Sequence, residues 1–271
     1  MISAWWLLPV LAAGWFSWRY AWWRPTVNLR YPRILMYHMI TEPVAGARFN
    51  GLRVSPSMFE RQLRWLKDNG WRSFTVSELI DQAGQVGEKG FAITFDDGYA
   101  DNATRALPLL QRYGCKATLY LVVDRHDRDW SRARKAHHDD DELKGIAKLS
   151  DEQVETLLAS GCFELGAHTL THPNFLELDD ATIQQELIEA KRQLEQRFHV
   201  PVRSFAYPFG LYRPQQVAAV RAAGYDSAVT VREGIDNPTD WNPLELARVK
   251  ISGRDSMLAF RQRLRTGRRG A

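Results

Sequence analysis

The chain is 271 residues long, with 45% hydrophobic and 25% charged residues, a formal net charge of +4 and a pI near 9.1. These values are those of a globular protein, and the length suffices for one large barrel domain. The excess of basic residues gathers between Arg19 and Arg33 and in the tail 261–271, not in an interior patch. This distribution argues against a nucleic-acid partner and favours an anionic membrane surface.

Residues 2–18 are nearly all apolar and precede the first charged residue, Arg19. Tryptophans stand at both ends of this run, as in the aromatic belts of membrane helices, and the run is near the lower limit of about 17 residues for a spanning helix. We therefore predict a membrane anchor helix over residues 1–24 and a single-pass protein of the bacterial inner membrane, in contact with the lipid bilayer. A cleaved signal peptide is disfavoured because the run has no positive start and no small-residue cleavage site. An interfacial helix lying in the headgroups is the remaining alternative.

The remaining residues, 25–271, alternate strand-like and helical segments, which predicts an α/β protein with a parallel barrel or sheet. A strand candidate at 34–38 ends in His38, and Ser55-Pro56 opens the next helix as its cap and first helical residue. Further strands are expected at 71–75, 91–95, 117–123, 163–167, 202–207 and 225–231, and further helices at 76–83, 101–113, 179–198, 214–223 and 256–264.

The strand over Phe91–Phe95 runs directly into Asp96, Asp97 and Gly98. The C-terminal ends of strands are where α/β proteins place their chemistry. Because successive residues of an extended chain point to opposite sides, one aspartate can hold a metal while the other stays free as a base. Taken alone, the pattern also fits a strand followed by an Asp-Gly turn and a helix cap.

The segment 124–148 is highly charged and is expected to form a loop or lid over the barrel mouth. Its His126, His137 and His138 accompany three aspartates at 139–141, so a second metal site is an alternative there. The run of charges favours a solvated segment over that alternative.

A pair of histidines, His168 and His172, follows the short apolar run 163–167. Two histidines four residues apart can face one point from a helical turn or a tight loop. Imidazole together with carboxylate suits zinc or a similar divalent transition metal. A histidine pair of this spacing is common in loops that bind no metal. Here another strand end carries two adjacent carboxylates, and the two features together indicate a metal site.

Three segments together resemble a known family. Thr94–Tyr99, His168–Pro173 and Ala206–Gly210 are similar, in order and spacing, to the first three motifs of the polysaccharide deacetylases, carbohydrate esterase family 4. The resemblance covers roughly residues 33–250 and implies a distorted (β/α) barrel with fewer than eight complete units. It also implies a divalent metal held by one Asp and two His, and an N-acetyl amino sugar as substrate.

Matched by motif position, the resemblance makes Asp97, His168 and His172 the metal ligands and Asp96 the catalytic base, with Zn²⁺ as the expected ion. Substrate contacts are expected from four further residues: Tyr99, Tyr207, Pro208 and Phe209. Family members act mostly on extracytoplasmic glycans, whereas Arg19 and the arginines after it place the following domain in the cytoplasm by the positive-inside rule. The side of the membrane therefore stays open.

The chain departs from the family pattern at two places. Ala206 stands where an arginine usually precedes the proline of the third motif, and the usual C-terminal general-acid histidine is missing, since the last histidine is His199. The start Met36-Tyr37-His38 resembles the branch that acts on poly-N-acetylglucosamine, and a first strand that closes the barrel would lie beside the last. We therefore expect His38 to replace the missing acid and Arg248, from the last strand, to approach the base.

The function expected from these residues is metal-dependent removal of an N-acetyl group from an amino sugar in a polysaccharide, an oligosaccharide or a lipid-linked glycan. The missing acid motivates one alternative, a catalytically silent barrel that binds glycan. Deformylation of a lipid-linked amino sugar is a second alternative. A glycosidase that uses paired carboxylates is a third, to which the histidine pair would add nothing. No protein partner is predicted.

Overall fold

The computed structural model describes residues 7–135 and 141–268. Its centre is a closed barrel of seven parallel strands. The first strand, β1, pairs with the last strand, β10, on one side and with β5 on the other, and this closes the ring. The barrel strands are β1 (Arg33–Tyr37), β5 (Gly90–Asp96), β6 (Ala117–Leu121), β7 (Phe163–Ala167), β8 (Ser204–Ala206), β9 (Ser227–Glu233) and β10 (Leu246–Lys250). This confirms the predicted (β/α) barrel with fewer than eight complete units.

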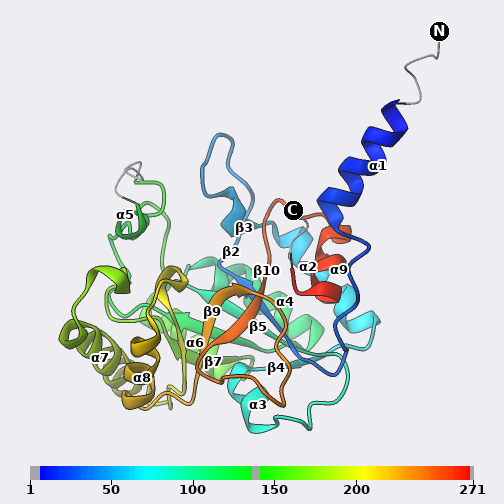
Figure 1. The fold of residues 1–271 in the computed structure, drawn as a ribbon. Helices are drawn as coiled ribbons and strands as arrows, with labels where there is room; N and C mark the ends of the chain where they lie inside the picture. The colour runs from blue at the N-terminus through cyan, green and yellow to red at the C-terminus, as the bar shows by residue number, and fades with distance from the viewer. Residues whose placement is uncertain (1–6, 136–140, 269–271) are drawn as a thin grey trace.

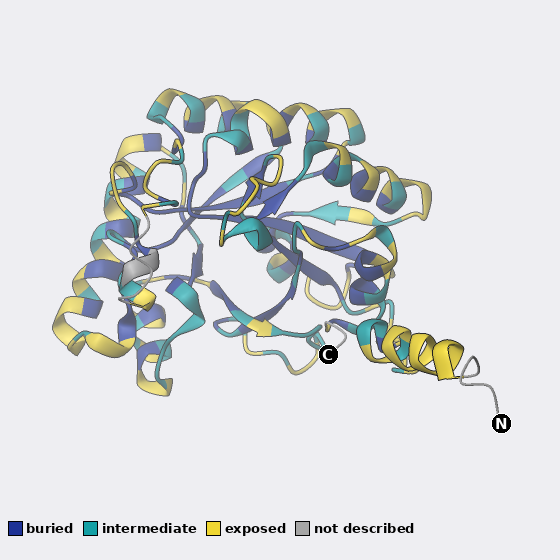
Figure 2. Cartoon of the chain, turned by 90° about the horizontal axis from the view of Figure 1, so that it is seen from above, coloured by how far each residue is buried: buried dark blue, intermediate teal, exposed yellow. Residues whose placement is uncertain are grey.

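Helices surround the barrel, and their outer faces are exposed while the strands between them are buried (Figures 1 and 2). They are α2 (Pro56–Asp68), α3 (Val76–Asp81), α4 (Leu107–Tyr113), α6 (Asp151–Ala159), α7 (Asp180–Phe198), α8 (Pro214–Ala222) and α9 (Met257–Thr266). Ser55 caps α2 by accepting a hydrogen bond from the Met58 N–H, with Pro56 at the first helical position as predicted. Short elements complete the fold: β2 (Met39–Ile40), β3 (Arg53–Val54), β4 (Arg72–Phe74), α5 (Ser131–Arg134) and helical turns at Asn50–Leu52, Asn102–Ala106, Phe175–Glu177 and Pro208–Gly210.

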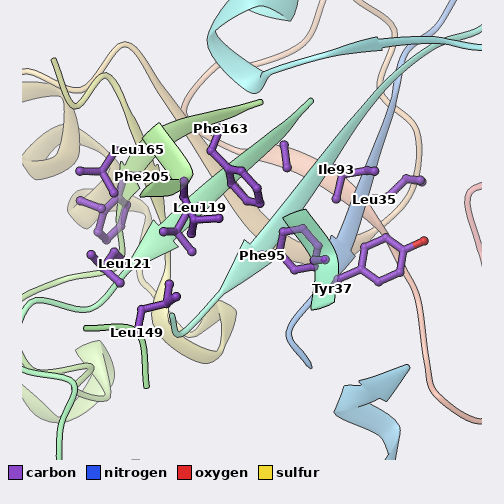
Figure 3. Close-up of a cluster of buried hydrophobic side chains, with 14 of the residues drawn as sticks. Leu35, Tyr37, Ile93, Phe95, Leu119, Leu121, Leu149, Phe163, Leu165 and Phe205 are labelled. Atoms are coloured by element: carbon purple, nitrogen blue, oxygen red, sulfur yellow. The ribbon is translucent and has the colours of Figure 1, made fainter. Parts of the chain in front are cut away.

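The barrel strands have one apolar face against the helices and a second face inside the ring. The outer face contributes a cluster that Figure 3 shows, with Leu35, Tyr37, Ile93, Phe95, Leu119, Leu121, Phe163, Leu165 and Phe205. A smaller cluster fills the interior, and its strand residues are Ile34, Ala92, Tyr120, Ala206, Val229 and Leu246. Burial of each large side chain contributes about 1.5–3 kcal/mol. The alternation of side chains along each strand therefore decides which residues enter the ring.

The residues whose side chains point into the barrel include functional groups near the C-terminal ends of the strands. On β5 they are Ala92, Thr94 and Asp96, and on β10 the position after Leu246 is Arg248. Because the strands are parallel, these inward columns end at the same mouth of the barrel.

The barrel interior below this mouth is filled by Tyr120, whose hydroxyl lies 2.7 Å from the Ser204 hydroxyl oxygen. Gly166 on the neighbouring strand makes room for the ring, since a Cβ at this position would lie 2.6 Å from two ring atoms of Tyr120. The Tyr120 side chain therefore closes the bottom of the cavity above it.

The N-terminal helix corrects the membrane prediction. α1 (Leu7–Tyr20) has 14 residues and projects away from the barrel (Figure 1). Its apolar side chains are exposed. At 1.5 Å per residue it is roughly 21 Å long, against about 30 Å for a bilayer core. Within the described ranges, no helix is long and apolar enough to cross a membrane. The predicted single-pass protein of the inner membrane is therefore wrong; residues 1–6 of the expected anchor lie outside the described residues.

The helix ends where Ala21 takes a left-handed conformation (φ 45°) and is buried. Arg265 of α9 donates hydrogen bonds to the carbonyl oxygens of Arg24 (2.6 Å) and Trp22 (2.7 Å). The helix thus stops at Tyr20, and the following turn packs against the last helix.

Candidate active site

A cavity of about 290 Å³ lies at the C-terminal ends of the strands. It is lined by Met36, His38, Phe49, Leu52, Asp96, Asp97, Trp130, Arg134, Leu143, His168, His172, Tyr207, Phe209, Val231 and Lys250. The lining residues come from strand ends and from the loops above them, including the β2–β3 connection and the charged segment 124–148. That segment therefore borders the barrel mouth, where the sequence placed it.

The two adjacent aspartates are separated by a change of backbone conformation. Asp96 ends β5 in the interior column, whereas Asp97 and Gly98 both take positive φ, 75° and 71°. Gly98 is required there, because a Cβ would also collide with Leu121. The turn sends the two carboxylates to different partners, as the two-role hypothesis expected.

Asp97, His168 and His172 meet at one point, and all three are buried. Asp97 Oδ1 lies 3.4 Å from His168 Nε2 and 3.5 Å from His172 Nε2, and the two Nε2 atoms are 3.1 Å apart. A tetrahedral ion with bonds of 2.0–2.1 Å has ligand atoms about 3.3 Å apart. The three side chains therefore fit a metal of zinc's size with little rearrangement.

The protonation states suit such a site. His168 Nδ1 lies 2.8 Å from the Ala206 carbonyl oxygen, so Nδ1 carries the proton and Nε2 presents its lone pair. Burial lowers the pKa of His172 to about 3, which keeps this imidazole neutral. Burial opposes ionisation of Asp97, but interaction with the imidazoles of His168, His38 and His172 holds its pKa far below the usual range.

The loop that carries the histidines is held by Glu186 of α7. Its carboxylate accepts hydrogen bonds from the backbone N–H of Leu170 and of Thr171, both at 2.9 Å, and from the Thr171 hydroxyl at 2.7 Å. The loop needs this support because Thr169 and His172 both have positive φ, 68° and 58°. Sequence reasoning missed Glu186, although an acidic residue beside Ile183 and Leu187 on the buried face of a helix was a usable signal.

Asp96 is paired with Arg248 in the barrel interior. Arg248, which is fully buried, donates from Nη1 and Nη2 to the two carboxylate oxygens at 2.7 and 2.8 Å. Burial favours the neutral acid, but the charge and hydrogen bonds of Arg248, helped by His38 and His168, keep the pKa of Asp96 below its usual value. His38 Nε2 lies 4.0 Å from Asp96 Oδ2. The pairing of β1 with β10 thus brings both residues to Asp96; the roles of Asp96 as base and His38 as acid stay predictions.

The other predicted contact residues divide into two groups. Tyr207 and Phe209 line the cavity, and the Phe209 ring stands edge-on to His172 at 4.5 Å between centroids. Pro208 and Tyr99 are buried outside the lining; the Tyr99 ring lies 3.6 Å from the ammonium of Lys148. Any substrate contact of Tyr99 would therefore come from its backbone.

The alternative second metal site has no counterpart in what the structure describes. His137 and His138 lie outside the described residues. Across residues 7–135 and 141–268, the trio at the barrel mouth is the one group of His, Cys, Asp or Glu close enough to hold an ion. The charged segment instead supplies Trp130, whose ring is 5.1 Å from that of His172.

A parallel (β/α) barrel whose mouth brings a buried trio able to hold a metal beside an arginine-paired carboxylate is compatible with the class of metal-dependent hydrolases. The family model described as polysaccharide deacetylase matches residues 83–228, and the chain belongs to this family. Membership makes it a carbohydrate N-deacetylase, an enzyme that hydrolyses the amide of an acetylated glycan.

Relatives agree with this assignment. YxkH of Bacillus subtilis (strain 168), which carries a polysaccharide deacetylase name, is 33% identical over 84% of this chain and 74% of its own length. The poly-beta-1,6-N-acetyl-D-glucosamine N-deacetylase of Staphylococcus aureus (strain MRSA252) is 23% identical over 73% of this chain and 68% of its own. Among solved structures, the polysaccharide deacetylase BA0330 of Bacillus anthracis matches with a TM-score of 0.72 and 28% identity, over 87% of this chain and 69% of that one.

Proposed function

We propose that the protein is a zinc-dependent N-deacetylase whose base is Asp96 and whose acid is His38. The observation that carries the proposal is the juxtaposition of two units at one cavity: the trio of Asp97, His168 and His172, and the Asp96–Arg248 pair. A glycosidase would need a second carboxylic acid across the cavity, and the described lining offers only Asp96 and Asp97.

Asp97, His168 and His172 would hold the ion through one carboxylate oxygen and two Nε2 atoms. Two imidazoles favour zinc over magnesium or calcium, which prefer oxygen ligands. When bound, zinc supplies Lewis acidity that polarises the acetyl carbonyl and acidifies the attacking water. The Ala206 carbonyl oxygen fixes the orientation of His168, and the Glu186 carboxylate holds the loop that carries both histidines.

Asp96 takes the proton of the attacking water, and Arg248 keeps its carboxylate ionised and oriented for this step. His38, protonated, gives a proton to the nitrogen of the amide as the C–N bond breaks. The water oxygen ends in acetate and the sugar keeps a free amine, so atoms and protons balance. The backbone N–H of Tyr99 is the proposed donor to the developing oxyanion.

Aromatic side chains would bind the sugar ring, since Trp130, Tyr207 and Phe209 line the cavity. The volume of about 290 Å³ lies at the lower end of small-molecule sites. It suits one sugar ring at the reaction centre, with the rest of the glycan outside.

The test is acetate release from an N-acetylglucosamine oligomer by metal-stripped protein, before and after addition of Zn²⁺. We expect release only with metal, products of unchanged chain length with new free amines, and loss of activity and of stoichiometric zinc in His168→Ala while the fold survives. Unchanged activity in a chelator would refute the metal role. Binding of the oligomer without acetate release would support the silent barrel, and formate release from an N-formyl sugar, without acetate from its N-acetyl counterpart, would support the deformylase.

A further inference from the structure

Lys148 is a buried cation at the end of the charged segment 124–148, and no step of the proposed reaction uses it. It is 9% exposed. Its Nζ atom lies 3.6 Å from the centroid of the Tyr99 ring and 4.4 Å from that of the Trp130 ring. Across residues 7–135 and 141–268, this atom has no hydrogen-bond partner. The ammonium is therefore held by two aromatic rings, whose faces attract a cation.

The Lys148 side chain is charged at neutral pH. Burial lowers the pKa of Lys148 to about 8, and the charges of nearby carboxylates oppose this change. These carboxylates are Asp97, Asp129 and Asp101. Burying a charge costs free energy that the surroundings must offset, and here the carboxylate charges and the two rings provide the offset.

The backbone of Lys148 is fixed to the turn after β5. The Leu149 N–H donates to the Gly98 carbonyl oxygen at 2.8 Å. The Ala100 N–H donates to the Ala147 carbonyl oxygen at 3.0 Å. The two hydrogen bonds form an antiparallel bridge between the turn and the end of the charged segment. Because this bridge uses the main chain alone, a substitution that removes the ammonium leaves residue 148 in place.

Trp130 has no comparable anchor. It comes from an irregular stretch just before α5, and within the described ranges its indole N–H makes no hydrogen bond. Trp130 is nevertheless only 5% exposed, and its ring centroid lies 5.1 Å from that of His172. The orientation of the indole therefore depends on side-chain contacts, among them the contact with the Lys148 ammonium.

Trp130 also stands between two cavities. It lines the active-site cavity of about 290 Å³. Together with His172 it lines a second cavity of about 320 Å³, whose other described lining residues are Arg128, Asp129, Ala133, Thr171 and Pro173. A turn of the indole toward the second cavity would remove an aromatic wall from the active-site cavity. The ring therefore has to be held where it is.

We propose that Lys148 is a positioning residue for substrate binding: its ammonium holds the Trp130 ring beside His172, as a wall of the cavity that receives the sugar. Lys148 is not among the described residues that line either cavity, so it acts through Trp130. This inference rests on the proposed deacetylase function, because it needs a glycan in the active-site cavity.

The first test removes the charge and follows the ring. In Lys148→Met an apolar side chain stays between the rings, whereas the cation–π contacts are lost. The full chain, loaded with zinc, is labelled with fluorotryptophan, and the fluorine NMR signal of Trp130 is assigned by its absence from Trp130→Phe. We expect this signal to shift and broaden in Lys148→Met, while the signals of tryptophans far from residue 148 stay in place.

The second test measures the effect on the glycan. Binding of an N-acetylglucosamine oligomer is measured by calorimetry in zinc-loaded Asp96→Asn, in which the proposed chemistry is off. Adding Lys148→Met should weaken binding roughly 3- to 30-fold, the effect of one desolvated cation–π contact, because the ring must then be ordered as the sugar binds. With Asp96 present, the loss should appear mainly in KM, as expected for lost ground-state binding. Lys144→Met, at an exposed position of the same segment, is the control for loss of one positive charge.

A double-mutant cycle shows whether the effect passes through Trp130. Trp130→Leu fills the position without an aromatic face. In this background Lys148→Met should weaken binding by less than about twofold. Zinc should stay stoichiometric in every variant, which a collapse of the metal site would not allow.

Three results would overturn the inference: an unmoved Trp130 signal, an oligomer affinity that Lys148→Met leaves within about twofold of its parent, or an equal loss in the Trp130→Leu background. Loss of zinc from Lys148→Met would overturn it as well and assign Lys148 a structural role at the metal site. Oligomer binding that responds to Lys148→Met, without acetate release by the wild type, would contradict the proposed deacetylase and leave the positioning role standing.

Discussion

Removing the guanidinium of Arg248 should both destabilise the barrel and shift the pH dependence of the reaction. Arg248 makes two hydrogen bonds to Asp96, one to the Thr94 hydroxyl at 3.0 Å and one to the Thr230 carbonyl at 2.7 Å. In Arg248→Met an unbranched apolar side chain replaces the stem of the arginine, but the buried carboxylate loses its counter-charge. Breaking a buried pair from one side costs about 3–5 kcal/mol, which lowers the unfolding midpoint by roughly 6–20 °C for a chain of this size.

The sign of the pH effect follows from the lowered pKa of Asp96. A carboxylate with a lowered folded-state pKa stabilises the protein fully above its unfolded pKa of about 3.9, and the stabilisation is lost as the pH falls through the folded value. The stability deficit of Arg248→Met should therefore be largest near neutral pH and shrink in acid. Without Arg248, burial dominates and raises the pKa of Asp96, so the acid limb of the pH–rate profile should move to higher pH.

The assay is urea denaturation at saturating metal, at neutral pH and near pH 4, together with kcat/KM across pH. Arg263→Met is the matched control, because Arg263 is also buried and pairs with Asp255 at 2.8 Å; it should lose similar stability and leave the acid limb in place. Asp96→Asn combined with Arg248→Met should be more stable than Arg248→Met alone. A cost below about 1 kcal/mol with an unmoved acid limb would refute the reasoning.

Three further changes have defined outcomes. His38→Ala should keep its metal and lower kcat by roughly 10²- to 10⁴-fold with loss of the basic limb of the pH–rate profile; an unchanged profile would return His38 to a structural role. Glu186→Ala should weaken zinc binding about 10- to 100-fold in competition with a chromogenic chelator, whereas Glu186→Gln, which keeps an acceptor for the loop N–H groups, should recover most of it; equal affinities would contradict the positioning role. Gly166→Ala should cost about 1–3 kcal/mol by forcing its Cβ into the Tyr120 ring, measured by urea denaturation, and a neutral result would mean that the ring has room to move.

The barrel and its metal trio were predictable because their signals are local. The strand before Asp96 and the strand before His168 are visible as apolar runs, and parallel strands deliver their C-terminal ends to one mouth. Barrel closure then placed Arg248 opposite Asp96 without any contact being known. The order of the strands and the side-chain period supplied the positions, whereas the roles of Asp97, His168 and His172 as ligands came from the resemblance to the family's motifs.

The remaining features depend on contacts that a sequence period does not carry. Whether Trp130, from an irregular segment, lies against His172 is decided by loop geometry. The anchor prediction failed because apolar composition does not give helix length: the described helix has 14 residues and ends at Tyr20.

The closure of the barrel by β1 and β10 also determines when the protein can become active as it folds. Asp96 and Arg248 are 152 positions apart, so a chain emerging from the ribosome contains the base long before its counter-charge. Until β10 docks, β1 and β9 each have an open edge, which is a hazard for aggregation. Contacts of such long range slow folding. Docking of β10 therefore both closes the ring and completes the Asp96–Arg248 pair on which the proposed chemistry depends.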